Sequence, residues 1–220
     1  MILSKRVLLD IETRLQSFEK TLTDFGLPQP TPEDLACVEI VTNTEPVVIR
    51  EEKDYNIEQL KTTLQDIIPK FTEEQSVIFQ TILDAVKQEQ ELLIFIDARG
   101  GCGKTFLLNS ILDAVRSLEP EGCVALAMGT TGIAANLLKL GRTFHSRMKA
   151  PLSPTEDSMM QISAQSDLAK LIRMARLMMI DECTMLDRYQ LQALDRSLRD
   201  LMGEPDKPFG GKIIILAGDF

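Results

Sequence analysis

The chain has 220 residues, and 24 lysines and arginines against 33 aspartates and glutamates give it a formal net charge of −9. This acidic balance excludes a protein whose whole surface attracts nucleic acid, so any nucleic-acid site must be a local patch. Hydrophobic residues at 44% and charged residues at 26% are typical of a soluble globular protein. The length suits one well-cored domain with an appendage, or two small domains.

Cysteine and histidine usage narrows the chemistry further. The four cysteines are far apart with no C-x-x-C pair, and His145 is the only histidine. This leaves almost nothing for a zinc site or for Ser-His or Cys-His catalysis, and it favours a reducing compartment. No stretch predicts a membrane span, and the N-terminus predicts neither a signal peptide nor a transit peptide.

The first 70 residues predict a helical leader. Apolar residues recur at the spacing of one helical face from Ser4 to Phe25, and a proline-rich connector follows. Residues 33–55 are acidic, with a short strand predicted at 47–49. A second amphipathic helix is predicted from Asn56 to Ile68.

From Phe71 onward, helical and strand patterns alternate. Helices are predicted at 72–89, 104–118, 131–138 and 187–202, and strands at 92–97, 123–128, 177–181 and 213–218, with a polar excursion at 150–166. Alternation of this kind predicts an α/β domain at 71–220, with a parallel sheet flanked by helices, behind the leader at 1–70.

The stretch around Lys104 is typical of a phosphate-binding loop. The apolar run Leu92–Ile96 predicts a strand buried on both faces, and the turn ARGGCG leads from it to Lys104-Thr105 at the start of a helix. Backbone N–H groups of such a turn cradle phosphate oxygens. We expect Lys104 to reach the β- and γ-phosphates and the Thr105 hydroxyl to ligate Mg²⁺. Ala98 replaces the first glycine of the pattern, which predicts a strained or weaker loop. The alternative is a structural glycine turn with a solvated lysine.

Asp181 and Glu182 end an apolar strand 77 residues after Lys104. In P-loop enzymes such a strand lies beside the strand that precedes the loop, which brings its end to the phosphates. We expect Asp181 to hold Mg²⁺, mainly through water, and Glu182 to activate the attacking water. The alternative is an acidic pair that caps the next helix.

Thr72 and Gln75 have two interpretations. Thr at the N-cap and Gln three residues later form a capping box for the 72–89 helix. Alternatively, the Gln75 amide reads the edge of an adenine. From the residues alone, the capping box is the better interpretation.

The segment between Glu121 and Glu156 contains no acidic residue. Its cations and hydroxyl groups suit sequence-independent contacts to a nucleic-acid backbone. The alternative is a solvated loop with a few cations. The candidate residues are Lys139, Arg142, Arg147, Lys149, His145, Thr130, Thr131, Thr143 and Ser146.

From Phe71 to its end, the chain resembles the petite-integration-frequency (Pif) helicases of superfamily one, especially those encoded by Helitron transposons. The matching segments are FTEEQ at 71–75, GGCGKTFL at 100–107, TTGIAANLL at 130–138, GRTFHSRMK at 141–149, SDLAKLIR at 166–173, IDECTM at 180–185, LDRSLRDLM at 194–202 and PFGGKIIILAGDF at 208–220. Residues 5–30 also resemble the leader of Helitron helicase domains. The resemblance implies a RecA-like P-loop NTPase fold.

The resemblance also implies roles for individual residues. Gln75 becomes the adenine-reading glutamine, and Asp219 belongs to a motif that couples the γ-phosphate to DNA. The implied ATP-binding residues are Gln75, Gly100, Gly101, Cys102, Gly103, Lys104, Thr105 and Phe106, and the implied single-strand contacts are Thr131, Gly132, Arg142, Thr143, His145, Ser146 and Arg147.

The function implied by the resemblance is an ATP-dependent 5′→3′ DNA helicase of recombination, repair, telomere maintenance or transposition. It would use ATP and Mg²⁺, bind single-stranded DNA, and act as a nuclear monomer. The family continues beyond Phe220 with a second RecA-like domain that supplies an arginine finger. We therefore expect a first motor domain that cannot unwind DNA alone and is poorly stable, with the strand at 213–218 left uncovered. The alternatives are a non-motor ATP-binding or DNA-tethering module and a P-loop phosphotransferase.

Overall fold

The structure, a computed structural model, describes residues 22–25, 27, 45–118 and 123–219. The chain divides into two compact units, Met1–Pro46 and Val47–Phe220. The helix predicted from Ser4 to Phe25 lies outside the described residues except for Leu22–Phe25, a 3-10 helix, η1. None of the helices in the described ranges has the length and apolarity needed to cross a bilayer.

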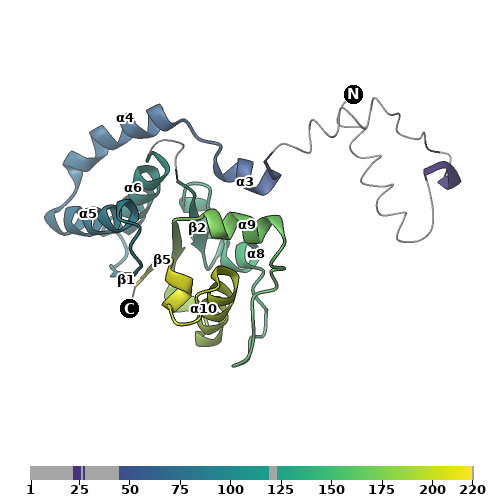
Figure 1. The fold of residues 1–220 in the computed structure, drawn as a ribbon. Coiled ribbons are helices and arrows are strands. Elements are labelled where there is room, and N and C mark those ends of the chain that lie inside the picture. The colour runs from purple at the N-terminus through teal and green to yellow at the C-terminus, as the bar shows by residue number, and fades with distance from the viewer. Residues whose placement is uncertain (1–21, 26, 28–44, 119–122, 220) are drawn as a thin grey trace. The chain divides into compact units, whose positions relative to one another are not determined.

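The second unit alternates helices and strands, as predicted (Figure 1). Its elements are α3 (Val47–Glu52), α4 (Ile57–Ile67), η2 (Ile68–Lys70), α5 (Glu73–Lys87), β1 (Leu92–Asp97), α6 (Lys104–Arg116), β2 (Ala125–Gly129), α7 (Gly132–Leu137), β3 (Arg142–Thr143), α8 (Phe144–Met148), α9 (Asp167–Met174), β4 (Leu177–Asp181), η3 (Cys183–Met185), α10 (Arg188–Met202), η4 (Pro208–Gly211) and β5 (Ile213–Gly218).

The short strand predicted at 47–49 is wrong, because this stretch begins helix α3. The β-branched residues there favour a strand by propensity, but tertiary contacts override that preference. Ile49 is buried in the apolar cluster beneath the sheet, and Glu52, one turn later, is buried as well. Helix α4 confirms the helix predicted from Asn56, and the Asn56 side chain caps it. Residues 47–70, expected within the leader, belong to the same compact unit as 71–220.

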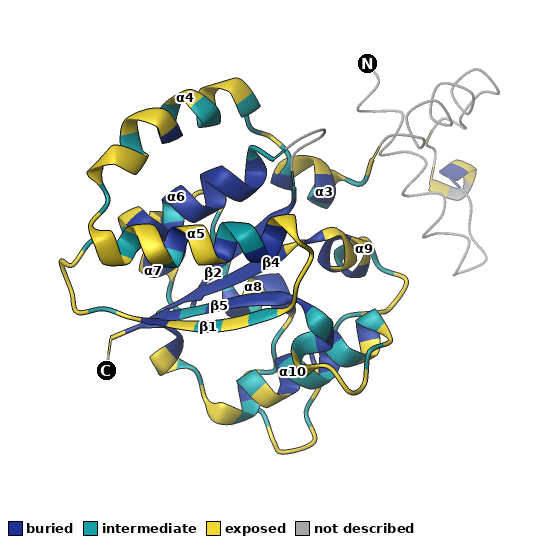
Figure 2. Ribbon diagram, turned by 60° about the vertical axis from the view of Figure 1, so that its left-hand side comes forward, coloured by how far each residue is buried: buried dark blue, intermediate teal, exposed yellow. Residues whose placement is uncertain are grey.

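The five strands of the described ranges are all parallel, in the order β1-β5-β4-β2-β3. One apolar cluster lies between the sheet and helices α4, α5 and α6, and a second lies between the sheet and helices α3, α8, α9 and α10. Figure 2 shows the sheet between these two helical layers, with β2, β4 and β5 mostly buried and β1 partly exposed. Because the strands are parallel, their carboxyl ends meet at one edge of the sheet, where the loops after β1, β2, β4 and β5 converge.

The prediction that Leu92–Ile96 is buried on both faces is wrong. Strand β1 is at the margin of the sheet, and in the described ranges it pairs with β5 alone. Ile96 is buried against α5 and α6, whereas Leu93 is 54% exposed on the other side. A continuous apolar run does not show whether a strand lies at the margin or at the centre of a sheet. A strand at the margin also packs at least one face against helices.

The prediction of an uncovered strand at 213–218 is also wrong. Strand β5 pairs with β1 on one side and with β4 on the other. Its residues are buried except for Leu216, which is half-buried. The expected poor stability therefore has no support from β5.

Candidate active site

The loop between β1 and α6 has the backbone geometry that its glycines allow. Gly101 and Gly103 have φ angles of +80° and +81°, which side chains with a Cβ rarely adopt. Ala98 is not among the described residues with positive φ, so the strain predicted there is wrong. Its N–H donates to the Gly218 carbonyl of the neighbouring strand at 3.2 Å. Alanine therefore fits this position without a left-handed backbone.

Lys104, the first residue of α6, faces the two carboxylates that end β4. Its Nζ lies 2.9 Å from Glu182 Oε1 and 3.4 Å from Asp181 Oδ1. Burial acts to lower the pKa of the Lys104 ammonium, but the hydrogen bonds and charges of Glu182 and Asp181 together outweigh it and raise that pKa. The structure thus brings together the three charged residues that the sequence singled out.

The position predicted for β4 is wrong in one respect. Strand β4 does not lie beside β1, because β5 lies between them. The carboxyl ends still converge, since α6 starts over the same edge of the sheet. The intervening strand adds a contact of its own: the Gly100 N–H donates to Asp219 Oδ2 at 3.2 Å.

The Asp181–Glu182 pair is held by its own backbone and by Thr130. The Glu182 N–H donates to Asp181 Oδ1 at 2.9 Å, and the Glu182 φ of +55° is in the left-handed region. Thr130 Oγ1 donates to the Glu182 carbonyl at 3.0 Å, and the Thr130 N–H donates to the Asp181 carbonyl at 3.2 Å. The left-handed φ is costly for a glutamate and points to a functional constraint. The sequence predicts Thr130 only as a hydroxyl group near DNA, because a contact across 52 residues has no local signature.

The alternative that this acidic pair caps the next helix is wrong. The side chain of Asp187 caps α10 instead, in a capping box with Gln190. Glu182 precedes the short helix η3 and makes no side-chain capping bond there. The two carboxylates are therefore directed to Lys104 and not to a helix end.

Gln75 forms the predicted capping box and also contacts the loop. Gln75 Oε1 accepts from the Thr72 N–H at 3.1 Å, and the Thr72 hydroxyl accepts from the Gln75 N–H at 3.2 Å. Its Nε2 donates to the Cys102 carbonyl at 3.4 Å. Phe106 is 38% exposed nearby, and its ring packs edge-on against that of Phe71 at 5.7 Å. Reading an adenine would require the Gln75 amide to exchange these partners.

Thr105 and Asp181 supply the oxygen donors that Mg²⁺ prefers. Asp181 is 2% exposed at the end of β4, and Thr105 is half-buried in the first turn of α6. Within the described ranges, no group of three or more His, Cys, Asp or Glu side chains suits a metal ion. These residues fit a Mg²⁺ ion that phosphates and water hold in part.

Three of the four cations predicted to form a basic surface between Glu121 and Glu156 pair with carboxylates from other parts of the chain, and one of the three, Arg147, is buried. The Arg147 side chain is 3% exposed and pairs with Glu52 of α3, and its Nη2 donates to the Leu140 carbonyl. Arg142 Nη2 lies 2.6 Å from Glu51 Oε2 on the surface. Lys139 pairs with Asp113 of α6. The local count of acidic residues could not detect these partners, which come from other parts of the chain.

The other candidate residues of this region lie near the carboxyl ends of β2 and β3. Thr131 and Thr143 cap helices α7 and α8 through their hydroxyl groups, and Gly132 and Ser146 are exposed. His145 is tied to α10, because its Nε2 lies 2.7 Å from Gln190 Nε2. Since Gln190 Oε1 accepts from the Asp187 N–H, the Gln190 amide donates to His145.

A glycine loop whose lysine faces a strand-terminal Asp–Glu pair, on a parallel sheet of this order, defines a P-loop NTPase with a RecA-like fold. The model of the PIF1-like helicase family matches residues 70–220. This chain belongs to that family, which confirms the resemblance to Pif helicases.

Similar proteins carry the same family name. The chain is 35% identical over 130 residues to "ATP-dependent DNA helicase PIF1" of Trypanosoma brucei brucei, covering 58% of this chain and 12% of that protein. It is 28% identical over 172 residues to "ATP-dependent DNA helicase PIF1" of Candida albicans, covering 77% and 18%. The structure of Bacteroides Pif1 in complex with ADP-AlF3 and single-stranded DNA has a TM-score of 0.54 at 30% identity, covering 67% of this chain and 32% of that one. The chain thus spans a small part of its curated relatives and about a third of the solved structures.

Proposed function

We propose that this chain is the nucleotide-binding first motor domain of an ATP-dependent DNA helicase that moves 5′→3′ along single-stranded DNA. The observation that carries the proposal is the contact of Lys104 Nζ with Glu182 and Asp181 beneath the glycine loop. The names of the relatives, ATP-dependent DNA helicases, support the class of reaction. The Bacteroides Pif1 complexes with single-stranded DNA support the class of partner.

In this proposal each residue of the site has one task. The loop amides and Lys104 bind the triphosphate, while Thr105 and Asp181 hold Mg²⁺, which supplies charge neutralisation at the phosphates. Glu182 accepts the proton of the attacking water. Lys104 contacts both carboxylates. A triphosphate that draws Lys104 away therefore frees Glu182 to act as the base.

Two hydrogen bonds connect the proposed nucleotide site to neighbouring segments and could couple nucleotide hydrolysis to DNA binding. Thr130 joins the Glu182 carbonyl to the turn that begins α7, and Thr131 follows it directly. Asp219 joins the end of β5 to Gly100 of the loop. DNA bound at Thr131 thus adjoins a residue that holds the Glu182 backbone. This arrangement supports hydrolysis that DNA stimulates.

For the DNA itself, we assign different tasks to the candidate residues. Arg147 pairs with Glu52 and His145 with Gln190, so we assign both to positioning helix α8 and not to phosphate contact. The remaining residues present hydroxyl groups, backbone N–H groups or cations near one edge of the sheet. The proposed phosphate contacts are Thr131, Gly132, Arg142, Thr143, Ser146 and Lys149.

The complete protein of this proposal includes a second RecA-like domain with an arginine finger, acts as a monomer, and serves recombination, repair, telomere maintenance or transposition. The nucleus is the expected compartment from the resemblance, and the Helitron type stays a prediction.

The test is ATP hydrolysis by a form that includes the second domain, with and without single-stranded DNA. We expect DNA to increase the rate at least tenfold, and strand separation to require a 5′ single-stranded tail on the loading strand. DNA binding without stimulation would replace the motor with a tethering module. Stimulated hydrolysis with unwinding from a 3′ tail would overturn the direction alone.

A further inference from the structure

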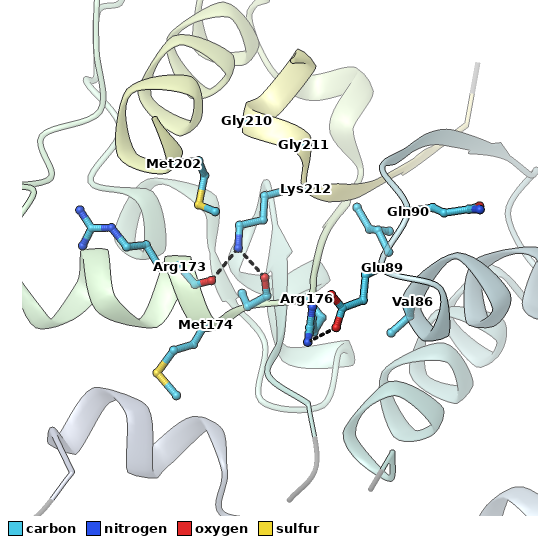
Figure 3. A pocket seen from close by; sticks show the side chains of 12 residues that line it. Val86, Glu89, Gln90, Arg173, Met174, Arg176, Met202, Gly210, Gly211 and Lys212 are labelled. Carbon is cyan, nitrogen blue, oxygen red and sulfur yellow. Dashed lines mark hydrogen bonds and ion pairs between the residues drawn. The ribbon is translucent and has the colours of Figure 1, made fainter. Parts of the chain in front are cut away.

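A pocket lies at the edge of the sheet opposite the glycine loop. Its walls come from the end of α5, the segment from α9 to β4, the end of α10 and the segment from η4 to β5, and its volume is about 450 Å³. Figure 3 shows Lys212 at its centre. Ile213 begins β5 and Arg176 directly precedes β4, so this pocket is at the amino ends of the strands. A strand length, roughly 17–20 Å, separates the two edges.

Lys212 is a buried cation without a negative partner among the described residues. The residue is 9% exposed, and its Nζ donates to the carbonyls of Arg173 at 2.8 Å and Ala175 at 2.7 Å. An ammonium has three N–H donors, so one is left over. Burial, followed by the charge of Arg176, lowers the pKa of Lys212 to about 8. A buried charge without a counter-ion is costly, and a bound anion would offset that cost.

The charges around the ammonium are unbalanced. Arg176 pairs with Glu89, with 2.6 Å between Nη2 and Oε1, so Glu89 balances Arg176 and leaves Lys212 without a carboxylate. Arg173 does not add to them, because its guanidinium is directed away from Lys212, and its Nε donates to the Leu201 carbonyl (Figure 3). The space beside Lys212 therefore carries an excess of one positive charge. An oxyanion is the ligand that guanidinium and ammonium groups bind best together.

Apolar side chains and Gln90 form much of the remaining lining. Met174 and Met202 lie on either side of the ammonium in Figure 3, and Val86 and Ile213 complete the wall. The size falls in the range of small-molecule sites, which combine apolar walls with a few placed polar groups. Methionine side chains adapt to ligands of varied shape. The ligand should therefore carry an apolar body beside its charged group.

We propose that this pocket binds a small organic anion, a carboxylate or phosphate monoester on an apolar body, with Lys212 and Arg176 as its cationic partners. The oxyanion accepts the free N–H of Lys212 and competes with Glu89 for Arg176. The site is separate from the glycine loop and does not rest on the proposed function.

The first experiment compares matched probes on the full 220-residue chain by amide chemical shifts. Hexanoate and hexanamide have the same length and differ in charge. We expect hexanoate, hexyl phosphate or both to shift the amides of 173–176 and 210–213 in a saturable way, and hexanamide to bind at least tenfold more weakly. Equal binding of hexanamide would overturn the anion site, as would the absence of a shift with both anions at millimolar concentration. If inorganic phosphate binds as tightly as hexyl phosphate, the proposal that the ligand carries an apolar body is overturned.

The second experiment uses variants. Arg176→Gln and Lys212→Met should each lower the affinity for the anion about tenfold or more, because each removes a charge-assisted hydrogen bond. Lys170→Met, on the exposed side of α9, is the matched control and should bind as the parent does. If Lys212→Met does not fold, the affinity of Arg176→Gln tests the site. The Arg176 side chain is 46% exposed, so we expect this variant to fold. Unchanged affinity in Arg176→Gln would overturn its assignment, and the same result in a folded Lys212→Met would overturn the site.

Discussion

Glu52 and Arg147 form an ion pair inside the protein, with 2% and 3% of their side chains exposed. The pair joins α3 to α8 across 95 residues of sequence. Glu52 Oε2 and Arg147 Nε have no hydrogen-bond partner among the described residues, so the pair is not fully satisfied. It fixes α3 to the edge of the sheet where Thr143 and Ser146 are presented.

Arg147→Met should lower the free energy of unfolding by about 3–5 kcal/mol, because it leaves the Glu52 carboxylate buried without a cation. The double variant Glu52→Leu/Arg147→Met should recover most of that loss, since an apolar pair needs no counter-charge. Chemical denaturation measures both. Arg142→Met, at the exposed pair with Glu51, is the control and should change stability by less than about 1 kcal/mol. An Arg147→Met variant as stable as the parent would show that the pair contributes little.

Glu51 should weaken DNA binding by holding Arg142. Glu51→Gln is therefore expected to strengthen single-strand binding, and Arg142→Gln to weaken it for every base sequence. The salt slope should fall by about 0.7 for the lost phosphate contact in Arg142→Gln. Fluorescence anisotropy at several salt concentrations measures both. If both variants keep the parent's affinity and salt slope, Arg142 is a solvated surface residue.

Lys104→Ala should abolish measurable binding of Mg-ATP, because the lysine supplies the charge at the β- and γ-phosphates. Stability without nucleotide should fall as well, since Asp181 is 3% exposed and loses its cation. Calorimetry measures the affinity, and circular dichroism checks the fold. A folded Lys104→Ala variant that binds Mg-ATP as tightly as the parent contradicts a phosphate loop here.

Substitutions of Glu182 and Asp181 should have different effects in a form of the protein that includes the second domain. Glu182→Gln should keep nucleotide binding and lose hydrolysis by roughly 10²–10⁴-fold, because only the base is removed. Asp181→Asn should also raise the Mg²⁺ concentration needed for half-maximal rate. A Mg²⁺ titration of the steady-state rate compares them. Normal hydrolysis by Glu182→Gln would assign the base to another residue.

The stability of the chain should rise with pH between about 8 and 10.5 because of Lys212. Burial lowers its pKa to about 8 in the folded protein, whereas the ordinary value is 10.5. In this window the unfolded chain binds a proton that the folded chain has lost, so unfolding becomes less favourable as pH rises. The charge that acts on the ammonium is that of Arg176, whose ion pair with Glu89 lines the same pocket as Arg173. Denaturation midpoints across this range should rise in the parent and much less in Lys212→Met; equal slopes would contradict the low pKa.

Much of the active site was predictable because it depends on near neighbours in the sequence. The strand, glycine turn and helix start from Leu92 to Lys104 form one continuous segment, and the capping box of Thr72 and Gln75 spans four residues. The end of β4 at Asp181 was predictable for the same reason, since an apolar run followed by two carboxylates has a clear local pattern. The convergence of these segments then follows from the parallel sheet.

The tertiary structure alone decided which strand lies beside which, and which charges meet. Apolar periodicity reports which face of an element is buried but not its neighbour, so β5 could not be placed between β1 and β4. Glu52 and Arg147, or Thr130 and Glu182, are separated by tens of residues, and their contacts depend on how the helices pack on the sheet. The sequence by itself determined the fold class and the segments that form the phosphate loop and its carboxylates. Long-range packing decided which arginines remain available to DNA, because a cation's partner is set by distance in space and not along the chain.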